Sequence, residues 1–145
     1  MLVHRYLVVA NQTLGGELLL AKIRELARAG PSAFHVVVPA TPPSDHVWTE
    51  EEAAKLATSR LDSALERMAR LGLDADGEVG DGSPMLAIED AIRDQGPFEA
   101  IVLSTLPPGL SRWLRLDLPH RVESAFGIRV IHVIGDPDHA GVARH

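Results

Sequence analysis

FEAIVLS, residues 98–104, is a short apolar run that is bounded by prolines and by polar residues. Such a run is typical of a strand that is buried on both faces, as in a parallel sheet covered by helices. Three other runs have the same character: RYLVVAN (5–11), AFHVVVPA (33–40) and IRVIHVIG (128–135). A fifth, more polar strand is predicted over 73–82, near an edge of the same sheet.

Helical patterns alternate with these strands. The predicted helices cover 14–30, 49–72, 83–96 and 117–127. Thr49 and Glu52 have the spacing of a capping box at the start of the second helix. Ser83 is a predicted N-cap of the third helix, and Pro84 suits its first position.

The alternation of strands and helices predicts parallel pairing through right-handed crossovers. The predicted fold class is α/β, with a five-stranded parallel sheet and helices on both faces. We expect one domain over residues 1–136 and a polar tail over 137–145, which we expect to be disordered. In such sheets ligands bind beyond the carboxyl ends of the strands, where the strand order reverses.

Composition excludes several classes of function. The chain is 46% hydrophobic, has a net charge of −6 and contains no cysteine. An acidic chain is a poor general nucleic-acid binder, and disulfides, thiolate metal sites and cysteine catalysis are excluded. No apolar run approaches the roughly 18 residues of a membrane span, and no signal peptide is evident. We therefore expect a cytoplasmic protein without a nucleic-acid or membrane partner.

Known catalytic and metal motifs are absent from the sequence. The seven histidines form no H-x-x-x-H or H-E-x-x-H pair, and Gly-x-Ser-x-Gly does not occur. We therefore predict no catalytic residue and no metal site.

Four segments, in the same order along about 130 residues, resemble the universal stress proteins. YLVVANQT stands where that family has a strand ending in Asp-Gly-Ser, and EVGDGSPMLAIEDAI resembles its Gly-Asp-x-Pro loop and following helix. FEAIVLST and FGIRVIHVI resemble its strand ending in Gly-Ser and its closing strand. The resemblance implies the same α/β fold. It also implies a homodimer formed through the last strand, residues 128–134, which is apolar and expected at a sheet edge.

The resemblance does not extend to the ATP site. Family members that bind ATP carry Gly-x2-Gly-x9-Gly-Ser/Thr after the fourth strand, where glycines and a helix start hold phosphates. Those positions are Ser104, Pro107, Asp117 and Leu118 here, or Leu116 and Asp117 for the last pair if the alignment shifts by one. The three glycines are missing, Pro107 has no N–H, and the family's strand-one Asp is Asn11.

Residues at or beyond the predicted strand ends are the candidate ligand-binding residues. They are Asn11, Gln12, Thr13, Val38, Gly80, Gly82, Ser83, Ser104, Thr105, Gly109, Arg112 and Arg115. Each group has a structural alternative. The segment 11–13 could be a turn that caps the next helix, residues 80–83 could serve only their own turn, and the arginines could be a solvated patch around Trp113.

The segment 104–122 supports two specific predictions. Asp117, two residues before Pro119, is predicted to be an N-cap whose charge suits the helix dipole and occupies the former phosphate position. Arg112, Arg115 and Arg121 could instead clamp an anionic ligand, with Trp113 stacked on a ring.

Three functions remain open from the sequence. The first is a non-catalytic, dimeric regulatory or ligand-binding module with a degenerate ATP site, no cofactor, and a protein partner or small anionic ligand. The second is an ATP- or AMP-binding protein that uses Arg112, Arg115 and Asn11 in place of the glycine loop. The third is a nucleotide hydrolase or transferase, which the lack of a Mg²⁺-ready carboxylate beside a glycine loop disfavours.

Overall fold

The computed structural model describes residues 2–42 and 47–136. The five predicted strands are present as β1 (His4–Val9), β2 (Ser32–Pro39), β3 (Ala75–Gly80), β4 (Ala100–Thr105) and β5 (Arg129–Ile134). All neighbouring pairs are parallel, in the order β3-β2-β1-β4-β5. The predicted fold class is confirmed, and β3 lies at an edge as expected.

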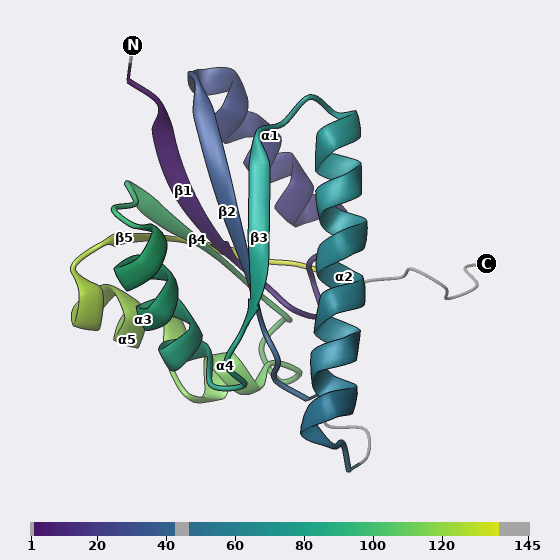
Figure 1. Ribbon diagram of the computed structural model, residues 1–145. Coiled ribbons are helices and arrows are strands. Elements are labelled where there is room, and N and C mark those ends of the chain that lie inside the picture. Colours follow the sequence, from purple (N-terminus) through teal and green to yellow (C-terminus); the bar gives the residue numbers. More distant parts are fainter. Residues whose placement is uncertain (1, 43–46, 137–145) are drawn as a thin grey trace.

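Helices cover both faces of the sheet (Figure 1). The elements are α1 (Glu17–Ala29), α2 (Glu50–Arg70), α3 (Pro84–Gln95), α4 (Arg112–Arg115) and α5 (Leu118–Phe126). Residues of α1 and α2 belong to the core on one face, and residues of α3, α4 and α5 belong to the core on the other. The short helix α4 was not predicted. No helix of the described residues is long and apolar enough to cross a membrane.

The two central strands explain the continuous apolar runs. Successive residues of a strand point to opposite faces, so Val8 packs with the α1–α2 core while Leu7 packs with the α3–α5 core. All six residues of β4 are buried. Inside a strand that is covered on both faces, an unpaired polar side chain would be costly. Polar side chains are therefore found at the strand ends.

The edge strand β3 contains two glycines because helices approach it closely. A Cβ at Gly77 would lie 2.5 Å from the Val36 carbonyl oxygen and 2.7 Å from Leu61 Cδ1 of α2. A Cβ at Gly80 would lie 2.7 Å from Ala87 Cβ of α3. A side chain at Gly77 or Gly80 would therefore clash with these neighbours, so both positions require glycine.

Helices α2 and α3 begin after the predicted caps Thr49 and Ser83. The predicted cap of α5, Asp117, makes no capping hydrogen bond. Thr49 Oγ1 accepts a hydrogen bond from Glu52 N at 3.0 Å, and the Glu52 carboxylate accepts one from Thr49 N at 3.1 Å. Helix α1 starts later than predicted because 11–16 folds into two successive turns. In these turns Leu14 N donates to Asn11 O and Gly16 N donates to Thr13 O.

The capping box can be tested by removing its hydroxyl. Thr49→Ala should lower the free energy of unfolding by about 1 kcal/mol, because the amide of Glu52 loses its acceptor. Thr49→Ser retains the oxygen and should stay within about 0.5 kcal/mol of the wild type. Urea denaturation of both variants measures the difference, and equal losses would show that the hydroxyl is not the stabilising group.

Candidate ligand-binding site

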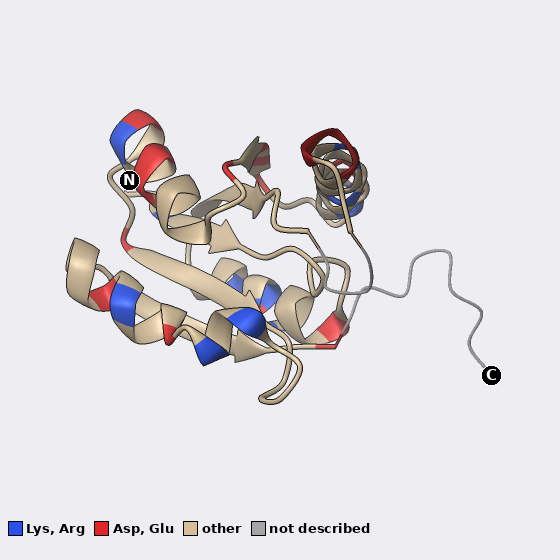
Figure 2. Ribbon diagram, turned by 90° about the horizontal axis from the view of Figure 1, so that it is seen from below, with Lys and Arg blue, Asp and Glu red and all other residues tan. Residues whose placement is uncertain are grey.

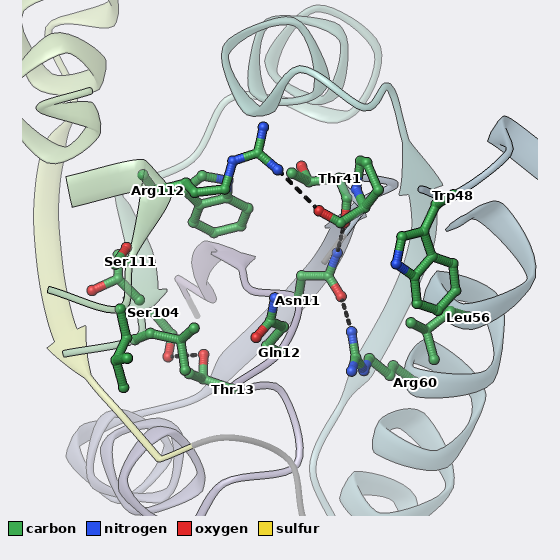
Figure 3. A pocket seen from close by; sticks show the side chains of 15 residues that line it. Asn11, Gln12, Thr13, Thr41, Trp48, Leu56, Arg60, Ser104, Ser111 and Arg112 are labelled. Carbon is green, nitrogen blue, oxygen red and sulfur yellow. Dashed lines mark hydrogen bonds between the residues drawn. The ribbon is translucent and has the colours of Figure 1, made fainter. Parts of the chain in front are cut away.

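A cavity of about 460 Å³ opens at the carboxyl ends of β1 and β4. These neighbouring strands are the point where the strand order reverses, since β2 lies on one side of them and β5 on the other. The residues around the cavity come from the end of β1, the connection after β2, helix α2, the end of β4 and helix α4 (Figure 3). The topology predicts a ligand site at this position.

Asn11 forms the centre of the cavity floor, and its amide is hydrogen-bonded at both ends. Its Nδ2 donates to Pro39 O at 2.8 Å and to Thr41 O at 3.1 Å. Its Oδ1 accepts from Arg60 Nη1 at 2.6 Å (Figure 3). The buried amide thus joins the end of β1 to the end of β2 and to α2. Because both amide donors and the oxygen are engaged, Asn11 shapes the floor rather than offering an open edge to a ligand.

A pair of buried hydroxyls lies beside Asn11. Thr13 Oγ1 and Ser104 Oγ are 2.6 Å apart, and each residue is 1% exposed. One hydroxyl donates to the other, so one of the two protons remains for a further acceptor. Gly135 packs against both side chains, since a Cβ there would lie 3.4 Å from each.

Thr105 connects the cavity to the edge strand β5. Its Oγ1 lies 2.8 Å from Nε2 of His132. Burial lowers the pKa of the His132 imidazole below its ordinary value. The neutral ring is therefore the favoured form near pH 7, and one of its nitrogens can accept the Thr105 proton.

Both tryptophans of the chain line the cavity. Trp48 precedes α2, and Trp113 lies in α4. Trp113 is 8% exposed because it packs into the core formed by α3 and α5. It therefore anchors α4 to the sheet. Leu56 and Leu110 complete the apolar part of the wall.

Arg112 reaches across the cavity from α4. Its Nη1 donates to Pro42 O at 3.1 Å, in the connection that follows β2 (Figure 3). Within residues 2–42 and 47–136, Arg112 has no carboxylate partner. A guanidinium carries five N–H donors, and a single bond to a carbonyl leaves most of them for a ligand.

Basic and acidic side chains lie on separate elements at this end of the molecule. Figure 2 looks onto the carboxyl ends of the strands, where the blue positions of α4 and α5 lie away from the red first turn of α2. That first turn contains Glu50, Glu51 and Glu52, and α4 contains Arg112 and Arg115. No carboxylate is among the described residues that line the cavity. In a protein of net charge −6, this cavity is suited to an anion.

The loop that follows β4 closes on itself. Pro107 O accepts from Leu110 N at 3.0 Å and from Ser111 N at 3.1 Å. Pro107 and Pro108 have no N–H to offer. Ser111 then caps α4 by accepting from Leu114 N at 3.1 Å. The loop therefore has few backbone donors free to surround a phosphate chain.

The prediction for Asp117 is wrong. Asp117 occupies the N-cap position of α5, but its side chain is exposed and makes no capping hydrogen bond. Its backbone is left-handed, with φ 56° and ψ 40°. The physical reason is the unpredicted helix α4. Asp117 N donates to Leu114 O at the end of α4, and the left-handed turn that joins α4 to α5 directs the side chain away from the helix start.

The structure brings half of the candidate residues to the cavity. Those that line it are Asn11, Gln12, Thr13, Ser104, Thr105 and Arg112. The others lie elsewhere: Val38 is in the core, Gly80 packs under α3, Gly82 and Ser83 form the turn before α3, Gly109 is at the exposed loop tip and Arg115 points to solvent. Of the three arginines proposed as a clamp, only Arg112 lines the cavity.

Sequence reasoning missed the contribution of α2. Leu56 and Arg60 line the cavity from one face of this helix. Their i, i+4 spacing was a signal that they share a face, but not that this face meets the end of β1. Thr41, Trp48 and Ser111 also line the cavity. No group of three or more His, Cys, Asp or Glu residues that could hold a metal occurs among the described residues.

Comparison with known proteins identifies the fold. No family model and no curated protein matches the sequence. Among solved structures, the chain is similar to the crystal structure of a universal stress protein in complex with cAMP. The TM-score is 0.58 at 21% sequence identity, over 92% of this chain and 98% of the other. The chain therefore has a universal stress protein-like fold.

If Asp117 were the N-cap of α5, replacing it with glycine would lower the free energy of unfolding. The left-handed backbone of Asp117 and its missing cap bond predict the opposite sign. A left-handed backbone costs most L-residues roughly 1 kcal/mol or more, and glycine little. Asp117→Gly should leave the free energy of unfolding unchanged or raise it by up to about 1 kcal/mol. Asp117→Val, which is β-branched, should lower it. Thermal and urea unfolding measure both, and a clear loss in Asp117→Gly would show that the carboxylate stabilises the helix after all.

Proposed function

We propose that this protein is a non-catalytic ligand-binding module that holds a small anionic ligand with side chains and does not bind ATP through a backbone loop. The observation that carries the proposal is the loop after β4. Leu110 N and Ser111 N bond to Pro107 O, and two prolines replace further donors. A triphosphate needs several convergent backbone N–H groups or a metal ion to offset its charge, and this loop has few to give.

Three properties of the cavity support ligand binding. Its volume, about 460 Å³, lies in the range of small-molecule sites. It combines apolar walls with a few polar groups, as such sites do. Arg112 is held at its edge by a neutral carbonyl and can bind an oxyanion.

The described lining residues also support a role without catalysis. They include no carboxylate, imidazole or thiol that could act as a general base or nucleophile. Thr13 and Ser104 are hydrogen-bonded to each other, and Thr105 is hydrogen-bonded to His132, which is not among the described lining residues. We propose a regulatory role, in which a protein partner responds to ligand occupancy.

A nucleotide with a single phosphate is the second candidate ligand. The specific observation in its favour is the similar universal stress protein solved with cAMP. In this chain the phosphate would bind Arg112. The base would need other contacts than Asn11, whose amide is engaged by Pro39, Thr41 and Arg60.

The proposal predicts a weak response to ATP. Millimolar ATP with Mg²⁺ should raise the melting temperature by less than about 1 °C. A ligand at 100 times its dissociation constant would stabilise by about 2.7 kcal/mol, a shift of several degrees for a domain of this size. Differential scanning fluorimetry and a phosphate-release assay provide the measurements. A shift of several degrees, or turnover of ATP, would refute the proposal.

We further propose a homodimer formed through β5. This strand pairs only with β4 among the described strands and so has an open edge. The other edge strand, β3, carries Asp76 and Glu78, which discourage pairing. On β5, Ile134 is 45% exposed although it is apolar. An unpaired apolar edge of this kind favours association with a second copy.

The dimer predicts a mass of about twice the chain mass of 15.7 kDa in size-exclusion chromatography with light scattering. Ile134→Lys should yield monomer, because the charge would enter the interface without entering the core. Ile131→Lys is a poorer test, since Ile131 packs against the α1–α2 core. Leu86→Lys, at an exposed position of α3, is the matched control and should remain dimeric. A monomeric wild type at high micromolar concentration would exclude this dimer.

A further inference from the structure

We infer that the cavity binds a small organic acid: a flat, mostly apolar body that carries one carboxylate, with the carboxylate on Arg112. This inference rests on the proposed function and specifies its ligand class. It follows from counting which polar groups of the cavity are already engaged and which remain for a ligand.

The groups that could read a nucleobase or a sugar are largely engaged within the protein. Both ends of the Asn11 amide are bonded. The Thr41 hydroxyl donates to Gly82 O at 2.8 Å. The Thr105 hydroxyl pairs with His132. These bonds use both amide donors of Asn11 and the hydroxyl protons of Thr41 and Thr105, so none of the three side chains has a donor left for the acceptor atoms of a base or sugar.

Several donors remain for a ligand. Among the described residues, Arg112 has one hydrogen bond, to Pro42 O. The Thr13–Ser104 pair has one proton left over. Ser111 Oγ accepts from Leu114 N, so its own proton remains. The Gln12 amide has no side-chain hydrogen bond to the described residues. A ligand that satisfies these donors must be rich in acceptors, as an oxyanion is.

The rest of the wall requires an apolar ligand body. Trp48, Leu56, Leu110 and Pro42 line the cavity together with Trp113. Indole and leucine surfaces gain most from covering a flat ring, through burial and offset stacking. Arg60 already donates to Asn11 Oδ1, and one acidic group is the number that the guanidinium of Arg112 can hold in a bidentate pair. An aromatic or heteroaromatic carboxylate combines these properties, whereas a triphosphate has more charge than the open donors can offset.

Arg112 is also placed so that a ligand in the cavity would change its contact with Pro42. Its bond to Pro42 O links α4 to the connection after β2. A carboxylate is a stronger acceptor for a guanidinium than a carbonyl. A bound carboxylate would therefore compete with Pro42 O for the Arg112 guanidinium and weaken this contact between the two walls.

The test compares 2-naphthoate with its neutral analogue 2-naphthamide by isothermal titration calorimetry on the full chain. We expect naphthoate to bind at least tenfold more tightly than the amide, because only the acid can pair with Arg112. Arg112→Gln keeps a donor for Pro42 but loses the charge, and it should remove this tenfold preference. Arg115→Gln, on the same helix but outside the cavity lining, is the matched control and should keep it. Circular dichroism establishes that both variants are folded.

Three outcomes would overturn the inference: no binding of naphthoate, equal binding of acid and amide, or equal effects of the two arginine variants. Parallel titrations with AMP and with Mg²⁺–ATP separate this failure from that of the proposed function. If AMP binds and naphthoate does not, the ligand class is wrong while the ligand-binding role stands. If Mg²⁺–ATP binds tightly or is hydrolysed, the proposed function itself fails.

Discussion

Burial of β1 and β4 on both faces is the constraint on which the rest of the structure depends. Helices cover the sheet from both sides, and every residue of β4 is buried. Side chains along these strands must be apolar or fully bonded, because an unpaired polar group in such a core is costly. Polar chemistry is therefore displaced to the carboxyl ends of the strands. The reversal of strand order separates the connecting segments there and leaves a cavity between them.

The floor of this cavity is built by one amide. Asn11 holds the end of β2 through two carbonyls and α2 through Arg60. An aspartate could accept from Arg60, but it could not donate to the carbonyls of Pro39 and Thr41. The asparagine therefore suits this internal network. Asn11 therefore has a structural role at the end of β1.

The wall formed by α4 is likewise held by contacts within the protein. The segment after β4 has prolines where a phosphate loop needs glycines, and its remaining donors bond within the loop. Trp113 inserts into the core and holds the segment as a helical turn. The wall is ordered by the protein's own contacts, so it needs no ligand to fold. This helical turn also sets the direction of Asp117, which sequence reasoning assigned to the cap of α5.

The sequence by itself determined the fold class, the order of the main elements and the end of the sheet where the cavity lies. Apolar runs, Ser83 and the Thr49–Glu52 box are local signals, and they act through neighbours along the chain. Residues such as Asn11 and Ser104 were also predictable as cavity residues, because they end the apolar runs 5–11 and 98–104 that predict two strands. Only the tertiary structure decided that Arg60, Trp48 and Ser111 join them, that Gly80 serves packing, and that Asp117 turns outward. These outcomes depend on how α2, α3 and α4 pack against the sheet. Such contacts join residues far apart in the chain, and no local pattern encodes their geometry.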